Sequence, residues 1–367
     1  MGAPIRAFLP GGSEVVSLWQ CPGAFPPTGS SLRVFLAAHV FITAFYTKNL
    51  AQFCANVKPT IEKSHISCYN TCKERWVIMI NVCDINVMKP LLAEHGFHFS
   101  KAKGQNFLTQ KWVPESIAQD AGVDETAGVL EIGPGIGPLT QQLCLRAKKV
   151  CAVELDKRLA PILEKTVGEF DNLEIIWDDV LNQDVAALVA EKFAGLRPMA
   201  CANLPYYITS PILSALLEAD CFDSVTVMVQ KEVAVRIAAK PGSEDYSAFT
   251  VFCQYYAEPK LLFDVPAHCF LPQPKVTSAV IQLQVRKERS WDILDEKIFF
   301  RLVKASFAMR RKKLSNGLAA GFPELGKTGA AEVIEAAGFD VNVRGETLSI
   351  EEFARIANVI VRRRNHD

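Results

Sequence analysis

Residues 128–143 read GVLEIGPGIGPLTQQL, an apolar strand-like run that leads through closely spaced glycines into a helical pattern. Gly133, Gly135 and Gly137 lie at the junction. Glycines at a strand-to-helix turn let a ligand approach the backbone beside a helix N-terminus. Pro138 stands where the G-x-G-x-x-G motif of dinucleotide-binding folds has its third glycine, which argues against a nicotinamide cofactor. The stretch therefore predicts the first strand and the ligand-binding turn of an α/β fold.

Three more strand-like runs follow, and polar side chains close each of them. Glu154 ends KKVCAVEL, 21 residues after Gly133, where such folds bind the two hydroxyls of a ribose. LEIIWDDV carries Asp178 and Asp179, whose carboxylates can accept from an adenine amine. The fourth run, MACANLPYY, carries Asn203. This ordered set describes a pocket for a nucleoside-bearing cofactor that faces a second, amine-bearing base.

Residues 203–206, Asn-Leu-Pro-Tyr, are suited to hold a planar exocyclic amine. The side-chain oxygen of Asn203 and the backbone carbonyl of Leu204 can each accept one amine hydrogen. Pro205 fixes its own φ and restricts Leu204, and Tyr206 offers a face for base stacking worth roughly 1–3 kcal/mol. A simple turn that closes a strand would use the same residue types. The place of the tetrapeptide after the glycine turn and the carboxylates favours the base-binding interpretation.

With these motifs the chain resembles the rRNA adenine dimethyltransferases, the KsgA (RsmA) family with its Dim-type and Erm relatives. The resemblance runs from about residue 90 to the end of the chain. It is carried further by KAKGQNFL at 101–108, VMVQKEVAVRI at 227–237, CFLPQPKVTSAV at 269–280 and SFAMRRKKLSNGL at 306–318.

The resemblance implies S-adenosylmethionine as the cofactor. It implies a substrate of two adjacent adenosines in a hairpin near the 3′ end of small-subunit rRNA, within a pre-ribosomal particle and each methylated twice. The cofactor residues that it implies are Asn106, Leu108, Gly133, Gly135, Glu154, Asp179 and Asn203. The catalytic residues that it implies are Asn203, Leu204, Pro205, Tyr206 and Phe270, with the rings of Tyr206 and Phe270 on either side of the target base.

Two other functions stay open. A non-catalytic nucleic-acid-binding factor on the same fold is disfavoured by the intact GQNFL, glycine and Asn-Leu-Pro-Tyr motifs. The second is an Erm-like enzyme that acts on large-subunit rRNA, or a DNA adenine methyltransferase. Leu204 stands where the DNA enzymes typically carry a first proline, and the LPQPKVTSAV segment and the basic C-terminal helix fit the small-subunit enzymes better than Erm.

The alternation of strands and helices indicates a mostly parallel sheet covered on both faces. Strands are predicted near 128–132, 149–154, 173–177, 198–202 and 225–230, with a strand pair within 260–285 at one sheet edge and a helix at about 114–121. Beyond Arg286 the patterns are helical, at 295–308, 311–320, 328–337 and 349–361. We therefore expect a Rossmann-like methyltransferase domain at 88–287 and a small all-helical RNA-binding domain at 288–367.

Charge supports RNA binding only locally. The formal net charge is zero, and residues 88–367 carry 33 basic against 36 acidic side chains. Basic clusters are nevertheless present, and phosphate contacts from such residues position a nucleic acid without reading its sequence. The expected RNA contacts are Lys101, Lys103, Arg310, Arg311, Lys312 and Lys313. The run at 362–364 fits a solvated face equally well.

Residues 1–87 show no clear period, and we interpret them as an upstream extension without a fold of its own. The apolar run at 34–46 has 13 residues and contains His39 and Thr43, too short and too polar for a membrane span of about 20 residues. Acidic residues are scarce through residue 61, so an organelle-targeting segment is the alternative.

The chain has 11 cysteines and no CxxC pair, which favours a reducing cytoplasm. His65, Cys68, Cys72 and Cys83 do not have the spacing of a standard zinc site. We therefore expect a cytoplasmic monomer without a membrane segment and without a metal.

Overall fold

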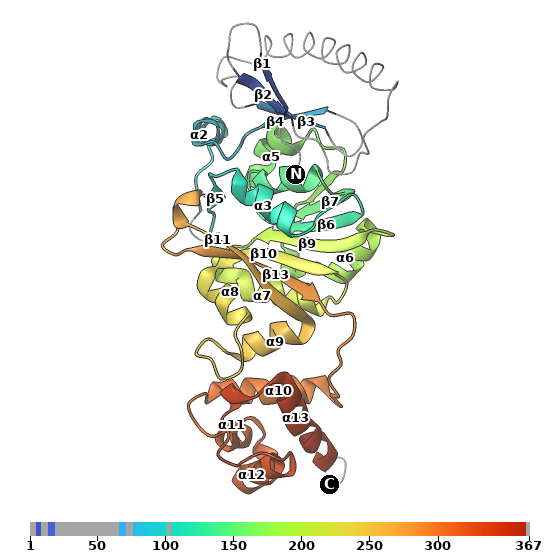
Figure 1. Ribbon diagram of the computed structural model, residues 1–367, viewed down its shortest axis with the longest axis vertical. Helices are drawn as coiled ribbons and strands as arrows, with labels where there is room; N and C mark the ends of the chain where they lie inside the picture. The colour runs from blue at the N-terminus through green and yellow to red at the C-terminus, as the bar shows by residue number, and fades with distance from the viewer. Residues whose placement is uncertain (1–4, 9–13, 19–65, 71–75, 101–103, 365–367) are drawn as a thin grey trace.

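A seven-stranded sheet forms the centre of the protein (Figure 1). The structure is a computed structural model that describes residues 5–8, 14–18, 66–70, 76–100 and 104–364. The strand order is β11-β13-β10-β9-β6-β7-β8. In chain order the strands are β6 (Ala127–Ile132), β7 (Lys149–Val153), β8 (Leu173–Ile176), β9 (Arg197–Asn203), β10 (Ser224–Gln230), β11 (Ala257–Val265) and β13 (Ser278–Val285).

The predicted parallel sheet with an antiparallel edge is confirmed. β6 pairs in parallel with both β7 and β9, while β13 pairs antiparallel with β10 and β11. The chain thus proceeds from β6 towards β8 on one side and returns to β9 on the other side of β6. Ligands bind at such a switch point, outside the carboxyl ends of the strands. The register places Ile132, the end of β6, beside Ala202 in β9.

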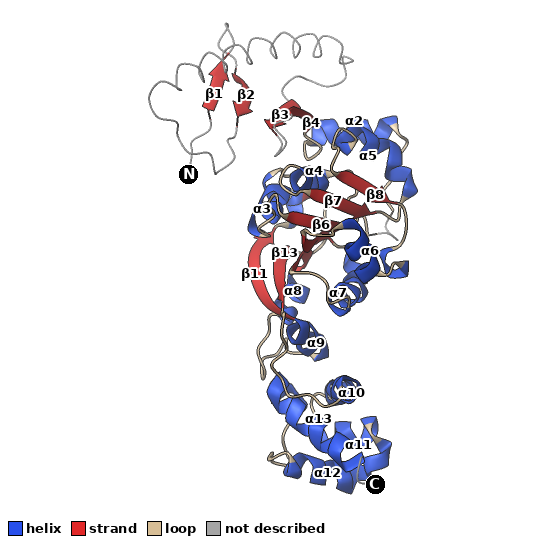
Figure 2. Cartoon of the chain, turned by 90° about the vertical axis from the view of Figure 1, so that its right-hand side faces the viewer, coloured by secondary structure: helices blue, strands red, loops and turns tan. Residues whose placement is uncertain are grey.

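Helices cover both faces of the sheet because alternate strand residues point to opposite sides. In β6, Val129 belongs to one hydrophobic core and Leu130 to the other. Figure 2 shows the helices on the two sides of the strands. The first core packs α3 (Trp112–Asp120), α4 (Pro138–Cys144) and α5 (Ala160–Val167). The second packs α6 (Val185–Lys192), α7 (Thr209–Glu218), α8 (Lys231–Ile237) and α9 (Ala248–Tyr256).

Ordered packing begins upstream of residue 88, the residue at which the methyltransferase domain is predicted to start. Helix α2 (Ile85–Glu94) crosses this boundary, and the side chain of Asp84 caps its N-terminus. Met79, Val82 and Cys83 are buried in the core with α3, α4 and α5. The region also contains two antiparallel strand pairs, β1 (Ile5–Phe8) with β2 (Glu14–Leu18) and β3 (Ile66–Asn70) with β4 (Trp76–Ile80).

The helical C-terminal part lies beyond α9 in both views (Figures 1 and 2). It consists of α10 (Glu296–Ala308), α11 (Leu314–Gly321), α12 (Gly326–Ala336) and α13 (Ile350–Arg364). Aromatic side chains join it to α9, with the Phe300 ring 5.7 Å from Phe252 and 6.2 Å from Tyr256. The helix predicted from residue 311 begins at Leu314 instead, because Lys313 has extended ψ of 144°. Among the described residues, no helix is long and apolar enough to cross a membrane.

Candidate active site

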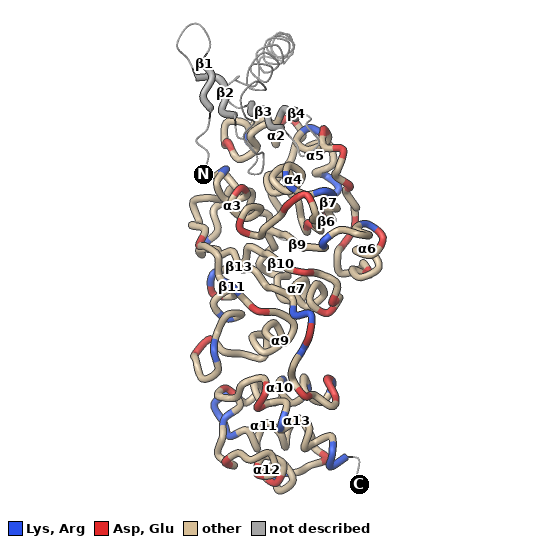
Figure 3. Tube along the Cα trace, turned by 45° about the vertical axis from the view of Figure 1, so that its right-hand side comes forward, with Lys and Arg blue, Asp and Glu red and all other residues tan. Residues whose placement is uncertain are grey.

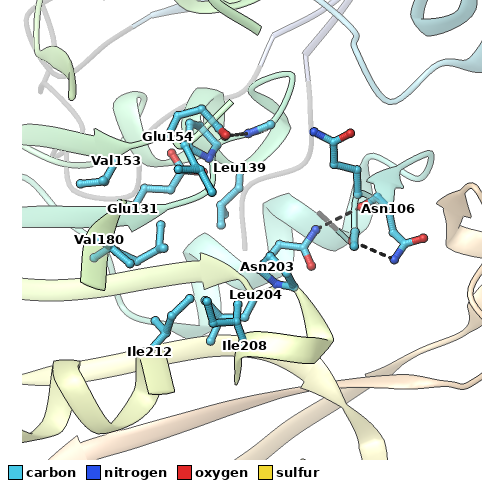
Figure 4. Close-up of a pocket in the computed structure, with 18 of the residues that line it drawn as sticks. Asn106, Glu131, Leu139, Val153, Glu154, Val180, Asn203, Leu204, Ile208 and Ile212 are labelled. Carbon is cyan, nitrogen blue, oxygen red and sulfur yellow. Dashed lines mark hydrogen bonds between the residues drawn. The ribbon is translucent and has the colours of Figure 1, made fainter. Parts of the chain in front are cut away.

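A pocket of about 130 Å³, open to solvent, lies at the switch point between β6 and β9 (Figure 4). Four segments line it: the 104–108 stretch, the glycine turn after β6, the ends of β7 and β8, and the turn after β9. Of the sequence-predicted residues, it gathers Asn106, Leu108, Gly133, Gly135, Glu154, Asp179, Asn203, Leu204, Pro205 and Tyr206. The fold therefore brings together side chains that are up to 100 positions apart in the sequence.

The glycine turn needs glycine for two separate reasons. Gly133, Gly135 and Gly137 have φ values of +68°, +61° and +93°, a region that side-chain-bearing residues rarely adopt. A Cβ atom on Gly135 would approach the Phe107 ring to 3.2 Å, and one on Gly137 would approach Val167 to 2.8 Å. A Cβ on Gly133 would meet nothing within 4 Å, so its open side faces free space at the pocket wall.

Glu154 is fixed in place by backbone donors. Its Oε2 accepts from the amide of Gly135 at 3.2 Å, and its Oε1 accepts from the amide of Asp156 at 2.7 Å. The residue is only 7% exposed. Each carboxylate oxygen has more than one acceptor site, so the group can still bind hydroxyls from a ligand. This carboxylate is therefore already oriented before a ligand arrives.

Glu131 lines the same pocket, although sequence reasoning did not include it among the site residues. It is 1% exposed, and its Oε2 has no hydrogen-bond partner within the protein. Burial raises the pKa of Glu131 to about 8; a contact with the Thr140 hydroxyl opposes this shift in part, and the neighbouring Glu154 charge adds to it. The signal in the sequence was a carboxylate inside an otherwise apolar strand. A buried acceptor without a partner is unusual in a folded protein and points to a ligand.

The Asn203 amide is oriented by a contact from the other side of the pocket. Its Nδ2 donates to the carbonyl of Asn106 at 3.4 Å, so in Figure 4 its Oδ1 points the other way. The Asn106 side chain in turn donates to the carbonyl of Gly104 at 3.2 Å. Leu204 is buried, and its amide donates to Met228 in β10. The amide oxygen of Asn203 is left to accept from a ligand.

The two tyrosines after Pro205 lie differently. The Tyr206 ring is partly buried, and its hydroxyl lies 2.6 Å from the hydroxyl of Ser278. Tyr207 is 59% exposed, lines the pocket, and was not predicted as a site residue. A Cβ on Gly104 would approach the Tyr207 ring to 3.3 Å. The 104–108 segment and the Asn-Leu-Pro-Tyr turn therefore pack against each other at the pocket mouth.

Asp179 lines the pocket, and its side chain accepts from the amide of Leu181, which caps a short 3-10 helix. Phe270 is the remaining predicted site residue. It is 4% exposed, belongs to the hydrophobic core, and its strand β12 (Phe270–Leu271) pairs with β5 (Phe107–Leu108). It is not among the residues that line the pocket, and its stacking role opposite Tyr206 stays a prediction.

The predicted RNA-contacting residues fall into three groups. Figure 3 shows where Lys and Arg occur along the described chain. Lys101 and Lys103 lie outside the described residues. Arg310 is held within the protein, because Nε donates to Glu346 at 2.8 Å and NH2 donates to the carbonyl of Ser243 at 3.1 Å. The exposed side chains in the turn between α10 and α11 are those of Arg311, Lys312 and Lys313. Among the described candidates, these three side chains are exposed and have the charge that could meet phosphates.

The C-terminal arginines are paired, as expected for a solvated face. Arg363 contacts Glu332 at 2.7 Å and Arg364 contacts Glu324 at 3.0 Å. No group of three metal-ligating side chains occurs within the part of the chain that the structure describes. The sequence candidates His65 and Cys72 lie outside that part.

A mostly parallel sheet with a pocket and an Asn-Leu-Pro-Tyr turn at its switch point is the architecture of a Rossmann-like methyltransferase. The chain belongs to the family described as "Ribosomal RNA adenine dimethylase", whose sequence model matches residues 96–362. It is similar to Ribosomal RNA small subunit methyltransferase A of Geobacillus thermodenitrificans, with 47% identity over 278 residues, 74% of this chain and 94% of the relative. The protein of that name from Clostridioides difficile is 44% identical over 276 residues, 75% of this chain and 95% of the relative.

Solved structures agree in fold. The crystal structure of the 23S rRNA methyltransferase ErmE has a TM-score of 0.55 and 25% identity, covering 70% of this chain and 99% of that one. A dimethyladenosine transferase from Plasmodium falciparum has a TM-score of 0.59 and 24% identity, covering 68% and 95%. The family and its enzymatic class are thus established for the chain.

Proposed function

We propose that the protein uses S-adenosylmethionine to dimethylate the exocyclic amines of two adjacent adenosines in the 3′-terminal hairpin of small-subunit rRNA, as a step in ribosome biogenesis. The observation that carries the proposal is the orientation of Asn203, whose Nδ2 is engaged by Asn106 so that Oδ1 is left for an incoming amine. The similarity to small-subunit methyltransferases, at 44–47% identity, favours this substrate over the large-subunit alternative, since ErmE is 25% identical.

The pocket fits a nucleoside-bearing, positively charged cofactor. Gly133 leaves open space at the wall, Glu154 is preoriented for ribose hydroxyls, and Asp179 stands at the next strand end. The buried carboxyl of Glu131, whose Oε2 has no partner within the protein, offers a hydrogen-bonding atom to a ligand. Asn106, Leu108 and Gly135 complete the proposed contacts. When bound, S-adenosylmethionine supplies a methyl group on a sulfonium centre.

The turn after β9 prepares the target amine. Adenine's amine is a poor nucleophile because its lone pair is delocalised into the ring. Oδ1 of Asn203 and the carbonyl of Leu204 each accept one amine hydrogen, which fixes the amine and directs its lone pair towards the methyl group. Pro205 holds this turn at φ −60°, and Tyr206 provides the stacking face. No general base is required before transfer, because the product ammonium is acidic enough to release its proton to water.

The RNA partner is held outside the pocket by charge. We assign phosphate contact to Arg311, Lys312 and Lys313, with Lys101 and Lys103 as further candidates near the 104–108 segment. The particle that presents this rRNA is a small-subunit precursor, and the enzyme acts on it as a monomer from the cytoplasm. We place the end of the methyltransferase domain near residue 287 and the RNA-binding domain at 288–367, and the burial of Met79 supports a start of the first domain upstream of 88.

Primer extension tests the proposal directly. Dimethylated adenosines stop the polymerase, so small-subunit particles that lack the modification should acquire adjacent stops near the rRNA 3′ end after incubation with enzyme and S-adenosylmethionine. Large-subunit particles serve as the matched control and should acquire none. Stops on large-subunit rRNA alone would favour the Erm-like alternative. RNA binding without stops on either substrate would favour a non-catalytic factor.

A further inference from the structure

The hydroxyl of Tyr206 contacts the hydroxyl of Ser278, a buried serine in a strand other than β9, which leads into the Asn-Leu-Pro-Tyr turn. Ser278 has no exposed surface and begins β13. The register places it opposite Gln230 of β10 on one side and Val265 of β11 on the other, so its backbone is fixed by both neighbours. The two hydroxyl oxygens of Tyr206 and Ser278 are 2.6 Å apart, close to the usual length of such a bond.

The other end of Tyr206 is fixed by the turn that carries Asn203. Pro205 precedes it, and the amide of Ile208 and the hydroxyl of Thr209 both donate to the carbonyl of Pro205. The ring between these two attachments lines the pocket and is only partly buried. A ring tethered at both the backbone and the hydroxyl has lost most of its freedom before any base arrives, so less order must be imposed on binding.

Stacking on a base does not require the hydroxyl of Tyr206, because a phenylalanine ring would stack equally well. Phe270, the second ring predicted at the base, lies in the core, so the pocket wall in this structure has Tyr206 without that partner. Ser278 is followed by the buried Ala279 and Val280, in surroundings where an unpaired hydroxyl is costly. Each hydroxyl therefore satisfies the other, and the bond fixes the angle of the ring.

We propose that Ser278 is a positioning residue for methyl transfer, which holds the Tyr206 ring at the angle that presents the target base to Asn203. The assignment rests on the proposed function, because it gives Tyr206 the base-stacking role. Ser278 touches neither cofactor nor base and acts through Tyr206 only.

Removing the bond from either end tests the assignment. Ser278→Ala and Tyr206→Phe should each lower single-turnover methyl transfer by about 3- to 10-fold, the effect of one lost hydrogen bond. The double variant should be no slower than either single variant, because both remove the same bond. Calorimetric affinity for S-adenosylmethionine should stay at the parental value in all three. Ser224→Ala is the matched control, since Ser224 is a buried serine in β10 whose hydroxyl has no partner, and its rate should be parental.

Fluorine NMR gives a readout that does not depend on activity. In protein labelled with 3-fluorotyrosine, the line missing from Tyr206→Phe identifies Tyr206, and Ser278→Ala should shift that line while Ser224→Ala leaves it in place. An unshifted line, parental rates in both single variants, or multiplying losses in the double variant would overturn the assignment. If the parent protein itself transfers no methyl group, the proposed function fails. If the Tyr206 line still shifts in Ser278→Ala, the contact between the two hydroxyls exists but has no role in methyl transfer, and the assignment of Ser278 is overturned.

Discussion

The ionisation of Glu131 should make the stability of the protein fall as pH rises. Burial raises the pKa of Glu131 to about 8 from 4.5. Below pH 4.5 the carboxyl is protonated in both the folded and the unfolded chain, so it contributes no pH dependence there. Between pH 4.5 and 8 the unfolded chain loses this proton and the folded protein keeps it. Each pH unit in that window therefore removes about 1.4 kcal/mol of folding free energy.

Replacing Glu131 by glutamine removes this linkage, because an amide does not titrate. Over the whole window the accumulated difference is on the order of 4–5 kcal/mol in favour of the Glu131→Gln variant. The variant should thus gain stability relative to the parent protein as pH rises from 5 to 8. Urea unfolding at several pH values measures the gain as a growing separation of the two midpoints.

The matched control is Glu164→Gln, which makes the same chemical change at an exposed position on α5. Its midpoint should follow the parent at every pH. If the Glu131→Gln and parent midpoints also run parallel from pH 5 to 8, Glu131 is ionised in the folded protein. In that case another group of the protein must stabilise the Glu131 carboxylate. The argument that its Oε2 awaits a ligand then fails.

Four further outcomes follow from the site. Asn203→Ala should slow single-turnover methyl transfer by an amount equivalent to roughly 2.7–4 kcal/mol, because a preorganised transition-state partner is lost. The affinity for RNA should stay nearly unchanged. A parental rate would exclude the amine-holding role. Glu154→Ala should weaken S-adenosylmethionine binding about 10- to 100-fold in calorimetry, and unchanged affinity in the folded variant would remove Glu154 from the site. Replacing Arg311, Lys312 and Lys313 by alanine should reduce the salt dependence of particle binding by about one unit per lost phosphate contact. The control Arg310→Ala should mainly lower thermal stability. If the logarithm of the binding constant falls equally steeply with salt in all proteins, the turn is a solvated surface without RNA contacts. Removing residues 1–87 should destabilise the protein relative to removing 1–75, because the four buried side chains of Met79, Val82, Cys83 and Val87 are lost together with the α2 cap. A fully buried Val or Met side chain contributes about 1.5–3 kcal/mol, and identical melting curves would contradict the packing.

The sheet and the cofactor half of the pocket could be predicted because their signals are local. Strand β6 is buried on both faces, so it reads as a continuous apolar run, and the glycines at positive φ stand directly after it. The carboxylates at the next two strand ends follow at regular intervals. Each of these features can be recognised within a window of about ten residues.

The features that could not be predicted depend on contacts between residues that are far apart in the sequence. Arg310 resembles its basic neighbours in the sequence, but it pairs with Glu346, 36 residues later, and with a carbonyl that lies 67 residues earlier. Met79 and Val82 show no period of their own, and they are buried only because α3 and α5 form a surface that they cover. Phe270 has the same composition signal as a stacking residue, and only the pairing of β12 with β5 places it in the core.

The two sides of the pocket also differ in how far apart in the sequence their interacting residues lie. On the cofactor side Glu154 is held by Gly135 and Asp156, which belong to the adjoining turns after β6 and β7. On the base side Asn203 depends on Asn106, 97 residues away, and Tyr206 on Ser278, 72 residues away. Perturbations of the sheet edge formed by β11 and β13 should therefore reach the base and leave the cofactor in place. Loss of methyl transfer with intact cofactor affinity is the signature expected of any change that acts through that edge, whether or not the altered residue touches the pocket.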